Sequence, residues 1–133
     1  MILDTSALIA ILLNEPEAVR FAGCIEDAAD GVFLSAACYL EASIIIDRSL
    51  DAVRRAMLDT FLDEFDIRVE PVTFEQARIA RTAFREFGKG RHPAKLNFGD
   101  CFTYALARVK RQKLLFKGND FSKTDIVAAS VVQ

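Results

Sequence analysis

The chain begins Met1-Ile2-Leu3-Asp4-Thr5-Ser6, a short apolar run that ends in a carboxylate, and the apolar stretch 7–13 follows it directly. This pattern predicts a buried strand that ends at Asp4 and then a helix. Open α/β sheets bind ligands at the carboxyl ends of parallel strands, which makes Asp4 a candidate site residue. The alternative is that Asp4 or Thr5 only caps the helix, because both side chains accept hydrogen bonds from free helix N–H groups. Evidence from the rest of the chain is needed to choose between a site residue and a helix cap.

Composition describes a globular protein without a strong charge. The 133 residues are 52% hydrophobic and 27% charged, with a net charge of −2, and we expect one domain over residues 1–133. No apolar run reaches the roughly 18–20 residues that a membrane span needs, and the N-terminus lacks the basic region of a signal peptide. Cys24, Cys38 and Cys101 lack metal-binding spacing, so we interpret them as buried free thiols of a cytoplasmic protein.

Short apolar runs alternate with amphipathic helices along the chain. After the first strand we expect strands at 32–34, 67–69 and 113–116, with a further one at 126–127. Helices are expected at about 7–13, 16–29, 35–46, 51–65, 73–87 and 99–111. The fifth helix shows a capping-box pattern at its start and an expected buried stripe of Ala77, Ala80, Phe84 and Phe87. The alternation predicts an α/β fold with a mostly parallel sheet of four to five strands and helices on both faces.

Glu41 stands out among the acids because its helical neighbours are apolar. Positions 37, 38, 44 and 45 carry Ala, Cys, Ile and Ile, so Glu41 projects from a face that should be buried. A buried carboxylate without a partner costs several kcal/mol or takes up a proton. A salt bridge to an arginine or bonds from backbone N–H groups would explain Glu41 structurally, and a bound cation would explain it functionally.

Two more acids fall near expected element ends. Asp100 lies in the first turn of the sixth helix, where the helix dipole favours an acid whatever its role, and Asp120 follows the fourth strand in an ordinary turn sequence. In the expected sheet, Asp4, Glu41, Asp100 and Asp120 can converge on one edge. Gathered carboxylates repel one another unless a cation lies between them, and oxygen ligands alone favour Mg²⁺ or Mn²⁺ over zinc. Such an ion can activate a water for phosphodiester hydrolysis.

Other site types are excluded by what the sequence lacks. There is one histidine, His92, so a paired-histidine acid and base is missing, and we expect His92 to be solvent-exposed or bonded to backbone. Neither GxxxxGK[ST] nor GxGxxG occurs, which removes the common nucleotide-binding loops. An Asp-x-Asp phosphatase would need an acid at position 6, where this chain has Ser6.

A basic stretch precedes Asp100. Between 78 and 95 there are six basic residues against the single acid Glu86, and Arg78, Arg81 and Arg85 share a helix face by their spacing. Basic groups beside an acidic metal site suit a phosphate-backbone substrate, although a solvated helix face explains them about equally well. The residues that we select as RNA-binding candidates are Arg85, Lys89, Arg91 and Lys95.

Four motifs in this order resemble the PIN-domain nucleases, and most closely the VapC-type toxins of prokaryotic toxin–antitoxin pairs. They are the opening 1–8, Tyr39-Leu40-Glu41, the stretch 96–101 (LNFGDC) and the stretch 114–121 (LLFKGNDF). The resemblance extends from Met1 to about Ile126. It implies a three-layer α/β/α nuclease with Mg²⁺ or Mn²⁺ held by an acidic cluster.

The resemblance also implies a role for each candidate residue. Asp4 and Asp100 match the principal metal ligands, Glu41 matches the third acid, and Thr5 or Ser6 matches a hydroxyl beside the site. Many PIN domains carry the fourth acid two positions before Asp120, where this chain has Gly118. Asp120 is therefore our candidate for the fourth acid, and the site has three carboxylates if that side chain points away.

The family further implies cleavage of single-stranded RNA, often within a structured RNA such as a tRNA. It implies homodimers and a VapB-type antitoxin whose C-terminal segment fills the active groove. An apolar groove between the third and fourth helices could receive that segment, although core packing explains Met57, Phe61, Leu62 and Phe65 equally well. Our hypothesis is a metal-dependent endoribonuclease, the toxin of a type II pair. The alternatives are a metal-dependent phosphatase or DNA nuclease, and a non-catalytic PIN-like module that binds RNA or a partner.

Overall fold

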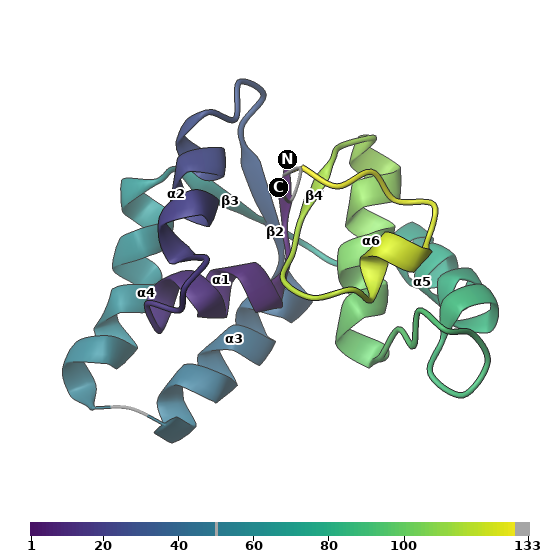
Figure 1. Ribbon diagram of the computed structural model, residues 1–133, viewed down its shortest axis with the longest axis horizontal. Coiled ribbons are helices and arrows are strands. Elements are labelled where there is room, and N and C mark those ends of the chain that lie inside the picture. The colour runs from purple at the N-terminus through teal and green to yellow at the C-terminus, as the bar shows by residue number, and fades with distance from the viewer. Residues whose placement is uncertain (50, 130–133) are drawn as a thin grey trace.

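Four parallel strands form the centre of the molecule. The computed structural model describes residues 1–49 and 51–129, and Figure 1 shows the arrangement of its elements. The strands are β1 (Ile2–Leu3), β2 (Val32–Ser35), β3 (Ile67–Glu70) and β4 (Leu114–Leu115), in the order β3-β2-β1-β4. Ile2 pairs with Phe33 on one side and with Leu114 on the other, so β1 lies inside the sheet. The carboxyl end of β1, where Asp4 follows, therefore lies in the interior of the molecule.

Helices cover both faces of this sheet, as Figure 1 shows. The helices are α1 (Thr5–Leu12), α2 (Ala18–Glu26), α3 (Ala36–Ser49), α4 (Ala52–Glu64), α5 (Phe74–Phe87) and α6 (Phe98–Lys110), followed by the short 3₁₀ helix η1 (Phe121–Lys123). Successive strand residues point to opposite faces, so Leu3 packs with α1 to α4, whereas Ile2 packs with α5 and α6. The expected three-layer α/β/α arrangement is confirmed.

Side-chain caps explain where several helices begin. Asp51 accepts a hydrogen bond from the N–H of Arg54 at 3.0 Å, and Thr73 accepts one from Gln76 at 3.1 Å. α6 begins one or two residues earlier than expected because Asn97 is its cap. The Asn97 side chain accepts from the N–H of Asp100 at 2.9 Å, and the Asp100 side chain accepts from the N–H of Asn97 at 3.0 Å. This reciprocal pair fixes Asp100 to the first turn of α6.

The structure corrects three local expectations. The second helix ends at Glu26 rather than near 29, and Ala77 and Phe84 of the expected stripe are exposed, so that Gln76, Ala80 and Ala83 form the buried stripe of α5. Gln76 can be buried because its side chain donates to the Pro71 carbonyl at 3.3 Å. The expected fifth strand at 126–127 is only an isolated bridge, in which Leu114 pairs with Ala128.

Two further expectations concern the surface and the thiols. None of the helices in the described residues is long and apolar enough to cross a membrane. All three cysteines are free; Cys38 and Cys101 are buried, and Cys24 is half-buried.

Candidate active site

Asp4 is both a helix cap and a candidate ligand. It follows β1, caps α1 and is only 3% exposed. Its Oδ2 accepts hydrogen bonds from the Ser6 N–H at 3.0 Å and from the Ser6 hydroxyl at 2.6 Å, and its Oδ1 accepts one from the Thr103 hydroxyl at 2.7 Å. Three bonds fix the orientation of the carboxylate, and Oδ1, which accepts only one of them, keeps a lone pair for a further partner.

A buried chain of polar groups supports Asp4 from α6 and α3. Thr103 is fully buried, and its hydroxyl oxygen lies 3.0 Å from the Cys38 sulfur. Because the single Thr103 proton goes to Asp4, the Cys38 thiol donates to Thr103. Burial raises the pKa of the Cys38 thiol to about 11, and the negative charge of Asp4 adds to this effect, so the thiol remains a donor at neutral pH.

Thr103 is absent from the residues that the sequence suggested. The signal for it was a threonine among the apolar positions of the sixth helix, three residues after Asp100. A buried hydroxyl needs a partner, and here the partner is a candidate ligand on a different element.

The two candidate hydroxyls beside Asp4 have different surroundings. Ser6 donates to Asp4 and accepts a hydrogen bond from the N–H of Lys117 at 3.0 Å, so it joins the end of β1 to the segment after β4. The Lys117 ammonium in turn pairs with Glu15 and, at 3.3 Å, with Glu17. Thr5 is buried, and its hydroxyl lies beside the Cys38 thiol, whose pKa it lowers against the effect of burial.

Glu41 from α3 lies against the first turn of α6. A Cβ added to Gly99 would lie 3.0 Å from the Glu41 carboxyl carbon and would collide with Oε2. A glycine at position 99 is therefore what lets the Glu41 carboxylate approach the residue next to Asp100 so closely. Within residues 1–49 and 51–129 Glu41 forms no ion pair, so the arginine partner considered for it is not found there.

The pKa of Asp100 reports how close the four acids lie. Burial raises the pKa of this carboxyl to about 7, against the lowering effect of the hydrogen bond from the Asn97 N–H. The negative charges of Asp4, Asp120 and Glu41 raise it further, in that order. The structure thus brings four acids from separate parts of the chain into electrostatic contact, with Asp120 exposed in the turn before η1. We call Asp4, Glu41, Asp100 and Asp120 the acidic cluster.

The donor set suits a hard divalent cation. Its charged groups are carboxylates, which favour Mg²⁺ or Mn²⁺, and the Gly99 backbone leaves space for one of them. As placed in the described residues, no three Asp, Glu, His or Cys side chains form a closed set of ligands. A cation would therefore have to draw the carboxylates inward, and its positive charge would relieve their mutual repulsion.

The basic candidates lie at the end of α5 and in the loop that leads to α6. Arg85, Lys89, Arg91 and Lys95 are all exposed. The loop is held at its base, where the Lys89 N–H donates to the Leu96 carbonyl at 2.9 Å, and it continues directly into Asn97 and Asp100. His92 within this loop accepts a hydrogen bond from the Ala94 N–H at 3.0 Å, which agrees with a backbone-bonded role.

Comparisons with known proteins place this geometry in a family. The model of the PIN domain family matches residues 1–127. The chain is 51% identical to Ribonuclease VapC28 of Mycobacterium tuberculosis over 97% of each chain. It is 46% identical to Ribonuclease VapC of Mycolicibacterium smegmatis, over 96% of this chain and 98% of that one.

Solved structures show the same fold at low sequence identity. The crystal structure of Mycobacterium tuberculosis VapC20, a Sarcin-Ricin loop cleaving toxin, matches with a TM-score of 0.77, 19% identity and 95% coverage of both chains. A toxin–antitoxin complex from Klebsiella pneumoniae matches with a TM-score of 0.73, 16% identity and 98% coverage of both chains. From the family model and the close relatives together, this chain belongs to the PIN-domain family and to its VapC ribonucleases.

Proposed function

We propose that this protein is the endoribonuclease toxin of a type II toxin–antitoxin pair, that it acts in the cytoplasm, and that it depends on Mg²⁺ or Mn²⁺. One observation supports the site most directly: the buried Asp4 carboxylate, which Ser6 and Thr103 hold, and the Glu41 carboxylate, which lies against Gly99, are both close enough to Asp100 for their charges to raise its pKa. A fold seldom tolerates this much like charge without a function for it. The 51% identity to a protein named as a ribonuclease supports the reaction.

Asp4, Asp100 and Glu41 would hold the cation, and Asp120 would add a fourth carboxylate. When bound, a divalent cation activates water and stabilises the charge on phosphate oxygens. The protein supplies the orientation. Ser6 and Thr103 hold the Asp4 carboxylate by three hydrogen bonds, and Asn97 holds Asp100. Without a cation, Asp100 is about half protonated near pH 7, so loading the site with metal releases a proton from this carboxyl.

RNA contacts are proposed for the basic residues before α6. Arg85, Lys89, Arg91 and Lys95 are exposed cations on the path to Asp100, and phosphate contacts of this kind provide affinity without reading sequence. We propose a structured RNA such as a tRNA as the target, by analogy with the family.

A VapB-type antitoxin is the proposed protein partner, and a homodimer the proposed assembly. Leu40, Ile44 and Met57 on α3 and α4 are 59%, 42% and 44% exposed, and such an apolar surface could receive an amphipathic antitoxin segment. Phe61 and Leu62, in contrast, are buried in the core, so they form no part of that surface.

The deciding experiment is cleavage of total cellular RNA by the purified protein, with Mn²⁺, with EDTA and with the Asp4→Asn variant. We expect discrete products only for the wild type with Mn²⁺. Parallel reactions with DNA strands and with a small phosphate ester test the nuclease and phosphatase alternatives. If the wild type, stripped of any co-purified protein under denaturing conditions and refolded, cleaves no RNA with Mn²⁺, the proposal is wrong and a binding module becomes the better interpretation.

A further inference from the structure

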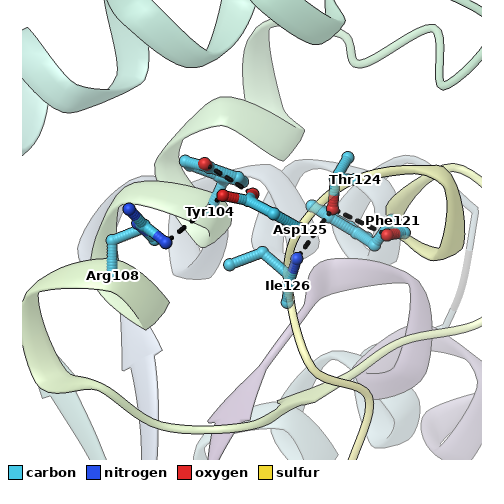
Figure 2. Close-up of polar contacts among 6 residues, drawn as sticks. All are labelled: Tyr104, Arg108, Phe121, Thr124, Asp125 and Ile126. Carbon is cyan, nitrogen blue, oxygen red and sulfur yellow. Dashed lines mark hydrogen bonds and ion pairs between the residues drawn. The ribbon is translucent and has the colours of Figure 1, made fainter.

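A large concave surface lies apart from the acidic cluster. It is a groove of about 1470 Å³ between α5, the carboxyl-terminal half of α6 and residues 125–127. None of the four acids of the cluster lines it. We call it the arginine groove, and Figure 2 shows the side chains of its wall where α6 meets residues 121–126.

Positive charge dominates the lining of the arginine groove. Six cationic side chains come from α5, from the last turns of α6 and from the residue before β4: Arg78, Arg81, Arg85, Arg108, Arg111 and Lys113. Three acids oppose them: Glu75, Glu86 and Asp125. Among residues 1–49 and 51–129, Arg108 is the only one of the six cations in an ion pair. A protein with a net charge of −2 has therefore concentrated unpaired cations in one groove.

The spacing of the arginines suits a chain of anions better than a single one. Arg78, Arg81 and Arg85 follow one stripe of α5, at i, i+3 and i+7, over about 10 Å of helix axis. On the other side of the groove, Arg108 lies in the last turn of α6 and Arg111 is the residue that caps this helix. Guanidinium groups on both sides of one groove match the repeated phosphates of a nucleic acid strand.

An exposed aromatic ring adds a second feature of single-strand binding. Phe74, the first residue of α5, lines the groove and is 79% exposed. The Arg78 guanidinium lies 6.0 Å from the centroid of its ring. A basic groove with an accessible aromatic side chain is how proteins bind unpaired strands, because every base can stack on the ring.

One carboxylate already occupies the groove wall, as Figure 2 shows. Asp125 accepts a hydrogen bond from the Tyr104 hydroxyl at 2.8 Å and pairs with Arg108 at 3.3 Å. The turn before it is fixed, because the Thr124 hydroxyl donates to the Phe121 carbonyl at 2.7 Å. Asp125 thus lies where it neutralises one arginine and repels a further anion.

We propose that the arginine groove binds the single-stranded RNA that flanks the bond to be cut, with Phe74 stacking on a base and Asp125 weakening the affinity. This inference rests on the proposed function. The two sites are connected by α6, where Asp100, Tyr104 and Arg108 follow one stripe at i, i+4 and i+8. That stripe spans about 12 Å, a distance that a strand leaving the acidic cluster would cross within a few nucleotides.

The first test is binding of a labelled single-stranded RNA in EDTA, which removes cleavage from the measurement. The Arg78→Glu/Arg81→Glu variant should bind about 10–100-fold more weakly and with a smaller salt dependence. The matched control is Arg48→Glu/Arg54→Glu, which makes the same charge change on exposed residues of α3 and α4. If both variants weaken RNA binding equally, the groove is not the binding site and the effect comes only from the change in net charge.

A variant that is expected to raise the affinity for RNA, rather than lower it, excludes misfolding as the explanation. Asp125→Asn keeps an acceptor for Tyr104 but removes the negative charge, so it should bind RNA about 3–10-fold more tightly. An unfolded variant would not gain affinity. Unchanged or weaker binding by this variant would contradict the role given to Asp125.

The third test uses the absence of tryptophan from the chain. Phe74→Trp places the single tryptophan of the chain in the groove, and a short RNA should quench its emission, excited selectively beyond the absorption of tyrosine, by stacking. Val19→Trp, at an 83% exposed position on α2, is the control and should not respond. Quenching of the Val19→Trp emission by RNA would overturn the assignment of the groove to RNA. Displacement of the RNA by a poly-glutamate peptide of the same total charge would also overturn it. Cleavage by the wild type, measured in parallel, shows whether a failure concerns the groove or the proposed function itself.

Discussion

The two ends of α6 differ in charge, in burial and in how they are built. The amino-terminal end carries Asp100, which is half-buried among three other acids and held by Asn97. The carboxyl-terminal end carries Arg108 and Arg111, which are exposed on the wall of a wide groove. The helix dipole favours both arrangements, since it stabilises an acid at the start and a base at the end. The dipole is therefore consistent with the difference in charge, whereas the difference in burial arises from tertiary packing.

The acidic cluster and the arginine groove should respond differently to the substitution of a single side chain. The acidic cluster depends on side chains from several segments that orient one another, so the loss of one member should affect the whole set. The arginine groove contains several cations that act at a distance through solvent, so the loss of one should have a small effect.

The largest expected effect separates the two ends directly. Asp4→Asn should lower RNA cleavage about 1000-fold or more, because it removes a buried charge and replaces one of the two oxygens that accept from Ser6 and from Thr103 with an amide donor. Arg111→Ala should lower cleavage only a few-fold, since the other cations of the groove remain. Initial cleavage rates at saturating Mn²⁺ measure both. Effects of similar size would show that the two ends do not differ in the way proposed.

Gly99→Ala should have the next largest effect. The new methyl group would collide with the Glu41 carboxylate, which can move aside because it ends a flexible side chain. We therefore expect little loss of stability but a weakening of Mn²⁺ binding by about 10–100-fold, as for other disturbances around metal ligands. Calorimetric titration measures the affinity. Gly23→Ala on α2, where an added Cβ meets no atom within 4 Å, is the control and should bind Mn²⁺ as the wild type does.

Thr103→Val tests the buried chain from Cys38 to Asp4. The valine keeps the shape but removes the hydroxyl, which leaves the Cys38 thiol without its acceptor and Asp4 without one donor. We expect a loss of about 1–3 kcal/mol in unfolding free energy and a loss of about 10-fold in cleavage. Thr103→Ser should recover most of both, because it restores the hydroxyl. If Thr103→Val cleaves RNA at the wild-type rate, then the orientation of Asp4 does not depend on this bond.

The sequence was sufficient to predict the layers of the fold, for clear physical reasons. The apolar run before Asp4 and the apolar neighbours of Glu41 each lie within a few residues of the acid in the sequence. Hydrophobic periodicity predicts secondary structure from such local patterns. The buried stripe of α5 was wrong at Ala77 and Phe84, and the burial of Gln76 depends on a bond to Pro71, which no helical spacing reveals.

The supporting residues of both surfaces could not be predicted in the same way. Thr103 contacts Asp4 across 99 positions of sequence, and the pairing of Asp125 with Arg108 crosses 17. The arginines of α5 were noted in the sequence, but their partners from α6 were not. The groove exists only once α5 and α6 pack together, and neither helix alone indicates it.

The smallest expected effect is a pH dependence that belongs to the acidic end alone. In the metal-free protein the pKa of Asp100 is about 7, above its ordinary value of 3.8, so between these values the folded state holds a proton that the unfolded state has lost. Stability therefore falls as the pH rises from about 4 to 7 and then levels off.

Asp100→Asn lacks this penalty, so above pH 7 it should be more stable than the wild type, by about 1 kcal/mol after allowance for screening. The gap should narrow below pH 7 and close near pH 4, and Mn²⁺ should remove it by stabilising the wild type. Urea unfolding in EDTA at several pH values measures this, with the exposed-acid variant Asp63→Asn as control. A difference in unfolding free energy that does not change with pH would mean that Asp100 is not held among like charges. The two ends of α6 would then differ in the sign of their charge but not in how their side chains are packed.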